Sequence, residues 1–206
     1  HIASAPATWS LIGEHIDHFG GIAIMGLADL RAAVAVSPRG DGTVSVRCLC
    51  ADGSTTEDSI TLEKVSALAA EQQPSVDSEG QPVVPPAPKG GLAARLGGIV
   101  HTMINRQLLS RETAGADITV VTDIPDNAGL GAAAAVDIAT ALALLGGADE
   151  PFDAPLRARL AEVCSQAVGT FASFPALRAR HSAALRGTGE SITIIDYALS
   201  LIHISE

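Results

Sequence analysis

Cysteine is scarce in this chain: among 206 residues there are only three, at positions 48, 50 and 164. Their number is odd and no pair has the C-x-x-C spacing, so the sequence predicts neither a zinc site nor a disulfide framework. We therefore expect a reduced, cytoplasmic setting. The sequence also lacks a basic and then apolar leader, so we expect no signal peptide.

Basic side chains are few as well. The 13 Lys and Arg are outnumbered by 23 Asp and Glu, which gives a formal net charge of -10. Because a nucleic-acid surface neutralises phosphates with clustered Lys and Arg, this balance argues against nucleic acid as a partner. It is compatible with a single nucleotide, since backbone donors and magnesium can meet that charge locally.

The chain lacks a long apolar run that is free of charge, although 47% of its residues are hydrophobic and its mean hydropathy is +0.31. The best candidate for a membrane span, residues 128–145, is rich in alanine and contains Asp137. A carboxylate inside a bilayer is costly, so we expect a buried helix here and no membrane partner. The length allows one large domain or two small ones, with a real core.

Strand patterns dominate the first third of the chain. Alternating and β-branched residues predict strands over residues 3–12, 22–27, 31–37, 43–50 and 59–63. The turn R-G-D-G at residues 39–42 is expected to close a hairpin between the third and fourth of these strands. In the fourth strand, Val44, Val46, Cys48 and Cys50 alternate with other residues, which predicts one buried face.

Helical patterns dominate the rest. Residues 72–91 hold five of the eleven prolines, so we expect a surface loop there, inside one domain. The strands before this loop have no helices of their own to cover them. Beyond it, apolar spacing predicts helices over 92–109 and 155–170, with His101 on the wetter side, and strands over 116–124 and 191–197. Periodicity alone therefore predicts an α+β fold.

One turn concentrates polar side chains. Residues 11–21 read L-I-G-E-H-I-D-H-F-G-G and place Glu14, His15 and Asp17 between two predicted strands. Carboxylates accept hydrogen bonds and imidazole donates or accepts them, a combination that suits a ligand with several hydroxyls. On the residues alone, a solvated charged turn is the commoner outcome for such a loop.

This turn resembles the galactokinase signature of the GHMP kinase superfamily, whose usual form is P-G-R-V-N-L-I-G-E-H-T-D-Y-N-G-G. The chain matches it without a gap at positions 6, 11–15, 17, 20 and 21. The resemblance implies that Glu14, His15 and Asp17 hold the hydroxyls of a sugar. It departs at Thr8, where galactokinases carry an arginine near the transferring phosphoryl group.

A glycine loop opens the alanine-rich helix. Residues 124–136 read I-P-D-N-A-G-L-G-A-A-A-A-V, and the unpaired N–H groups and dipole of such a helix entrance suit phosphate. The same pattern also describes an ordinary buried helix with a flexible entry. It resembles the GHMP motif P-x-G-x-G-L-x-S-S-A-A, which implies that ATP is bound by Pro125, Asn127, Ala128, Gly129, Leu130, Gly131, Ala132 and Ala133.

This loop also departs from the family. Asn127 replaces a glycine, and Gly131, Ala132 and Ala133 occupy the serine run, one serine of which helps to hold magnesium in the family. The resemblance therefore implies weakened Mg²⁺ binding and no metal ligand among the predicted site residues. Phosphoryl transfer is expected to suffer more than ATP binding, because it depends on metal and electrostatic positioning.

A third segment corresponds to the family's catalytic base. In galactokinases a later helix leads to G-I-M-D-Q, whose aspartate is the base, and the ungapped match puts Arg180 at the aspartate and His181 at the glutamine. An arginine cannot accept a proton at neutral pH. Asp126 and His181 are substitutes by residue type only. Otherwise we expect Arg178, Arg180 and His181 to form a basic, solvated helix face.

The resemblance implies the fold of a GHMP kinase N-terminal domain over residues 1–197, similar to domain 2 of ribosomal protein S5, with a mixed sheet and helices on one side. Residues 198–206 fit no part of the pattern, and the family's C-terminal domain is expected to be absent from this chain.

Two main functions stay open. The first is ATP-dependent phosphorylation of galactose or a related hexose, impaired because Thr8, Ala133 and Arg180 lack the family's chemistry. The second is a non-catalytic relative that binds sugar or nucleotide as a sensor or regulator. A truncated fragment without activity is a third reading.

Overall fold

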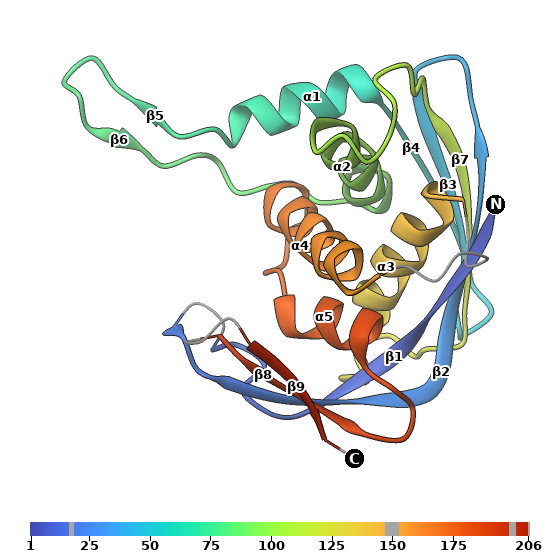
Figure 1. Ribbon diagram of the computed structural model, residues 1–206. Coiled ribbons are helices and arrows are strands. Elements are labelled where there is room, and N and C mark those ends of the chain that lie inside the picture. Colours follow the sequence, from blue (N-terminus) through green and yellow to red (C-terminus); the bar gives the residue numbers. More distant parts are fainter. Residues whose placement is uncertain (17–18, 147–152, 198–200, 206) are drawn as a thin grey trace.

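Two long strands organise the sheet. The computed structural model describes residues 1–16, 19–146, 153–197 and 201–205, and Figure 1 shows β1 (Ile2–Ile12) running alongside β2 (Ile22–Pro38). They pair antiparallel, with register shifts between Pro6 and Ala7 and between Ser10 and Ile12. The strands predicted over 22–27 and 31–37 are thus one strand, because β2 continues through residues 28–30.

The second edge of β2 is shared by two strands. β7 (Ala116–Thr122) pairs with residues 32–38 of β2, and β8 (Ile192–Asp196) pairs with residues 22–25, both antiparallel. The strand order is β4-β3-β7-β2-β8-β9, with β1 on the other edge of β2. β9 (Leu201–Ser205), which falls in the stretch that fits no family pattern, pairs with β8.

The predicted hairpin between residues 31–37 and 43–50 is wrong. β3 (Thr43–Leu49) pairs antiparallel with β4 (Thr55–Thr61) and parallel with β7, which therefore lies between β3 and β2. The turn still reverses the chain, and Arg39 Nη1 in it is 2.7 Å from Asp117 Oδ1 of the inserted strand. Ile118 and Val120 of β7 are buried, so a distant apolar strand takes the central place.

The alternation predicted in β3 is confirmed at Val44, Val46 and Cys48, all of which are buried. The strand predicted over 59–63 ends earlier, at Thr61. Thr61 caps a helix that the periodicity did not predict, α1 (Leu62–Glu71), by accepting a hydrogen bond from Lys64 N at 3.2 Å.

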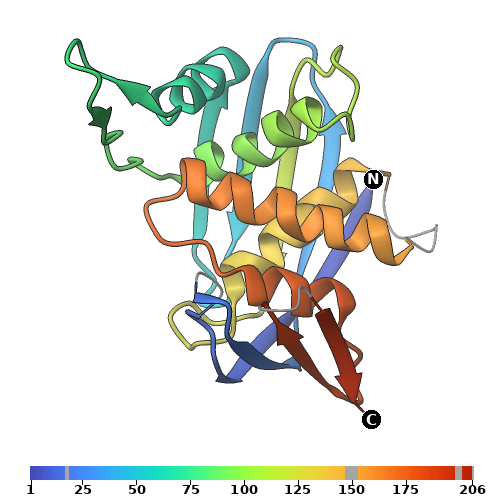
Figure 2. The ribbon, with the colours of Figure 1, turned by 60° about the vertical axis from the view of Figure 1, so that its left-hand side comes forward.

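The helices cover one face of the sheet, as Figures 1 and 2 show. They are α2 (Leu92–Asn105), α3 (Ala132–Leu144), α4 (Ala154–Phe171) and α5 (Arg178–Arg186), with α1 beside α2. The 92–109 helix ends four residues earlier than predicted, and the 155–170 helix is confirmed. The core lies between this layer and the inner face of the sheet.

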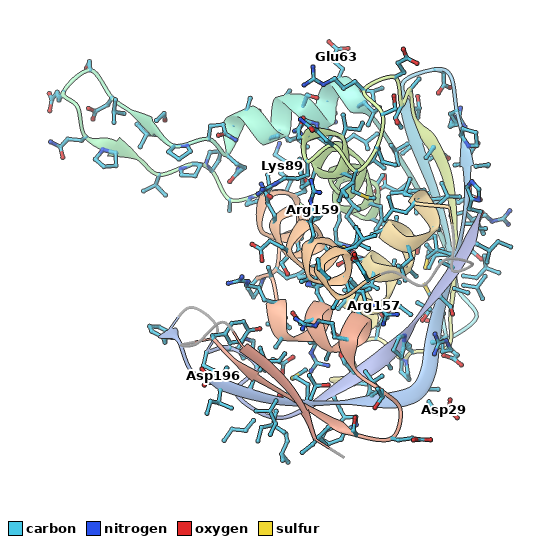
Figure 3. All side chains as sticks on the ribbon, in the orientation of Figure 1. Asp29, Glu63, Lys89, Arg157, Arg159 and Asp196 are labelled. Atoms are coloured by element: carbon cyan, nitrogen blue, oxygen red, sulfur yellow. The ribbon has the colours of Figure 1, made fainter. Side chains whose placement is uncertain are left out.

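The proline-rich stretch projects from the body of the molecule (Figures 1 and 2). It holds the two-residue strands β5 (Ser75–Val76) and β6 (Pro82–Val83), and its residues 73–87 are exposed. The predicted surface loop is therefore confirmed. Charged side chains also point outward at the edges of the fold, Glu63 on α1 and Asp29 on β2 among them (Figure 3).

The alanine-rich helix predicted to be buried is α3, most of whose residues are buried, Asp137 included. Among the residues that the structure describes, no helix has the length and apolar character needed to cross a bilayer.

Candidate functional site

The turn at residues 13–16, which we call the acidic turn, follows the end of β1. Gly13 has a φ of +82°, and a Cβ there would lie 2.1 Å from Ile22 O, so only glycine fits this close approach of the two strands. The next residue, Glu14, is half-buried, whereas His15 is exposed. Asp17, the third predicted sugar ligand, lies outside the described residues.

The glycine loop connects β7 to α3. Asn127, Gly129 and Gly131 have positive φ values of 58°, 72° and 66°. Helix α3 begins after Gly131, and no side chain caps its first N–H groups. The loop docks on β1, because Thr8 N donates a hydrogen bond to Leu130 O at 3.0 Å. The loop therefore presents an uncapped helix entrance beside β1.

Arg180 joins these segments. Its Nε pairs with Glu14 Oε1 of the acidic turn, and its Nη1 donates to the backbone oxygen of Thr8 and, at 3.2 Å, to Thr8 Oγ1. A Cβ on Gly131 would lie 2.5 Å from Thr8 Oγ1 and 3.0 Å from Arg180 Nη1. The guanidinium is thus packed between β1, the acidic turn and the glycine loop.

The prediction of a basic, solvated helix face at α5 is wrong. Arg180 is 4% exposed and His181 is 2% exposed. Only Arg178 lies near the surface, where it is 2.8 Å from Glu162 and stands over the ring of Tyr197. The sequence did not reveal that two polar residues of α5 face inward, because their partners are 44 and 166 positions away.

A buried polar network lies behind the glycine loop. Asp137 of α3 is 3.2 Å from His181 Nε2, and His181 Nδ1 is 3.0 Å from Ser165 Oγ. The other carboxylate oxygen of Asp137 is 2.9 Å from Arg95 Nε, a close ion pair that lacks hydrogen-bond alignment. With both imidazole nitrogens engaged, His181 is held in place rather than free to accept a substrate proton.

The cavity between these elements has a volume of about 440 Å³. It brings together Glu14, Arg180, His181, Phe174 and the predicted nucleotide segment, residues 125 and 127–133. Asp126 lines it too and is exposed. His15 is not part of its wall. Glu14 and the glycine loop, 111 or more positions apart in the chain, therefore face one space.

A smaller cavity of about 210 Å³ shares Asp126, Ala132 and Ala133 with the first. Cys48 and Cys50 line it, with their sulfurs 3.8 Å apart. Burial raises the pKa of Cys48 to about 11, and the neighbouring Cys50 thiol adds to the rise. Cys48 therefore acts as a small side chain in this wall rather than as a reactive thiolate.

Two stretches of the chain that contribute to this site match known protein families. Residues 1–38 match the galactokinase galactose-binding signature, and residues 95–175 match the GHMP kinases N-terminal domain. The chain is the N-terminal part of a galactokinase-like member of the GHMP kinase family. The first match contains Thr8 and Glu14, and the second contains the glycine loop, Asp137 and Ser165.

Solved GHMP kinases share the fold. A Lactococcus lactis galactokinase complexed with galactose superposes with a TM-score of 0.68 at 14% identity, over 99% of this chain and 47% of that one. A Methanococcus jannaschii mevalonate kinase superposes with a TM-score of 0.65 at 15% identity, over 100% of this chain and 56% of that one. The chain spans about half the length of these relatives. The predicted family and fold class are confirmed.

The polar groups around the glycine loop suit a phosphate group better than a metal ion. The uncapped entrance of α3 offers backbone N–H groups, and nothing lies within 4 Å of a Cβ built on Gly129, so an anion can approach there. Ala132 and Ala133 offer no hydroxyl. Within the described ranges, no cluster of three His, Cys, Asp or Glu side chains is placed to hold a metal ion.

Proposed function

We propose that this chain is the sugar- and nucleotide-binding part of a galactokinase-type kinase that binds ATP and a hexose but transfers the phosphoryl group poorly. The observation that carries the proposal is Arg180. A buried guanidinium, paired with Glu14, lines the cavity at the position where the family resemblance expects a carboxylate base. Arginine stays protonated and cannot take the proton of a sugar hydroxyl.

The ATP assignment rests on the glycine loop. Its positive-φ residues and the uncapped start of α3 suit phosphate oxygens, as the family motif does. Mg²⁺ would be held weakly, because Ala133 lacks the serine hydroxyl and Asp137 is already paired with Arg95 and His181. Since phosphoryl transfer relies on metal and electrostatic positioning, this loss lowers the rate more than the affinity.

The sugar assignment rests on the acidic turn. Glu14 lines the same cavity as the glycine loop, which supports a sugar site next to the proposed phosphate site. By resemblance, His15 and Asp17 complete the hydroxyl contacts, and galactose or a close relative is the sugar. We further propose that residues 1–197 act with a second, C-terminal domain that completes the cleft.

A second function is favoured by the same contacts. Arg180 ties the acidic turn to Thr8 and packs on Gly131, so a ligand that moves the glycine loop also moves the sugar side. A non-catalytic sensor or regulator needs this kind of link between two sites and does not need turnover.

The first prediction concerns turnover. We expect a low turnover number for the full-length protein in an ADP-release assay with ATP, Mg²⁺ and galactose. It should lie well below the lower end of the usual kinase range of about 1–100 per second. The pair Arg180→Asp with Ala133→Ser should raise the rate at least tenfold, because it returns a base and a metal ligand. Arg178→Gln, on the outer side of α5, is the control. Turnover within the usual range would refute the impairment.

A further inference from the structure

We infer that this cavity selects a sugar acid, a sugar bearing a carboxylate, over the neutral hexose, because one donor of its buried guanidinium, Arg180 Nη2, is left for a ligand carboxylate. The inference rests on the proposed function, in that it takes the cavity to be the sugar site. The side chain of Arg180 is 5% exposed, and its counter-charge is Glu14.

The donors of Arg180 are partly used. Nε is committed to Glu14 and Nη1 to Thr8, while Nη2 has no hydrogen-bond partner among the described residues. The guanidinium lines the cavity and so can be reached by a ligand in it. A planar fork of this kind binds carboxylates with two parallel hydrogen bonds.

A neutral hexose meets an obstacle in this arrangement. Glu14 contacts Arg180 through Oε1, so a sugar hydroxyl that takes over this oxygen displaces the guanidinium. That leaves a buried cation without a counter-charge, which is strongly unfavourable. The other buried carboxylate of the cavity cannot take over, because Asp137 is already held by Arg95 and His181.

A sugar carboxylate removes the obstacle. It replaces Glu14 on the guanidinium like for like, so Arg180 keeps a partner of the same charge and shape. Glu14, whose side chain is 23% exposed, is then released to accept the sugar's hydroxyls. In this arrangement Arg180 binds the sugar carboxylate and the acidic turn binds the sugar hydroxyls.

Calorimetric titration of the full-length protein tests this. Galacturonate should bind at least tenfold more tightly than galactose. Arg180→Gln should abolish that preference, while Arg178→Gln, two residues earlier on α5 and paired at the surface with Glu162, should keep it. Glu14→Gln should tighten galacturonate binding, because it removes the internal competitor for Arg180; this variant also serves if Arg180→Gln does not fold.

Two further ligands separate the outcomes. One contrary outcome is that galactose 1-phosphate binds more tightly than galacturonate and that inorganic phosphate binds without a sugar. These two results together would show that the guanidinium binds phosphate, and they would overturn the inference. Equal or tighter binding of galactose would overturn it too, yet would leave the proposed function standing. If ATP and every sugar fail to bind, the proposed function itself fails.

Discussion

Arg180 and Asp137 are the two charged side chains on which the site depends. Each is buried in contact with an opposite charge: Arg180 with Glu14, and Asp137 with Arg95. Removing one member of such a pair leaves a buried charge alone, which typically costs about 3–5 kcal/mol. The polar interior is therefore tied to the fold as well as to ligand binding.

His101 gives a prediction at the scale of one residue. It is half-buried between Ser66, Asn105 and the edge of Phe171, and burial lowers its pKa below the usual value of 6.5. The folded state therefore binds its proton less readily than the unfolded state does. The stability that depends on neutral His101 is present above pH 6.5 and is lost as the pH falls below it.

Urea unfolding at pH 7.5 and pH 5.5 measures this effect. The loss of stability on acidification should be smaller in His101→Gln than in the natural protein. An equal loss in both would contradict the assignment. His15, which is exposed in the acidic turn, provides the matched control as His15→Gln.

The sequence revealed some residues of the site and concealed others. Glu14 and the glycine loop stand in motifs whose spacing can be read directly, and the structure brings them to one cavity. The inward orientation of Arg180 and His181 could not be predicted, since α5 carries no clear apolar stripe. One signal was available: a carboxylate inside an apolar helix, Asp137, requires a buried partner.

At the scale of elements, the hydrogen bond from Thr8 N to Leu130 O fixes the glycine loop against β1. We predict that Gly131→Ala lowers the free energy of unfolding by about 1–3 kcal/mol, because the residue has a left-handed φ and its Cβ would press on Thr8 Oγ1. Gly129→Ala is the control, with a similar φ of +72° and nothing within 4 Å.

Urea unfolding of both variants separates backbone strain from contact. Gly129→Ala carries only the cost of the left-handed conformation, about 1–2 kcal/mol. A larger loss in Gly131→Ala supports the close packing of the loop on Thr8 and Arg180. Equal losses would mean that the loop does not pack there.

The local sequence could not predict which strands pair with one another in the sheet. The alternation of β3 and the β-branched run of β7 were readable, because each depends on one buried face. Their pairing depends on which strand enters the space beside β2. A turn at residues 39–42 indicates a reversal of the chain but cannot exclude the insertion of β7 between β2 and β3.

At the scale of the whole molecule, the sheet and the helical layer bring three distant segments to one place (Figure 2). The acidic turn comes from β1, the glycine loop from the end of β7, and Arg180 from α5. The contacts between them are concentrated in one guanidinium. A ligand at either side of the cavity is therefore expected to affect both sides.

Hydrogen–deuterium exchange of the full-length protein tests this central claim most directly. On addition of ATP with galactose or galacturonate, we predict slower amide exchange in residues 128–134 and in residues 8–16 together, with no change in the projecting segment 75–83. Slowing confined to one of the two cavity segments, or absent from both, would contradict the account that they form a single site.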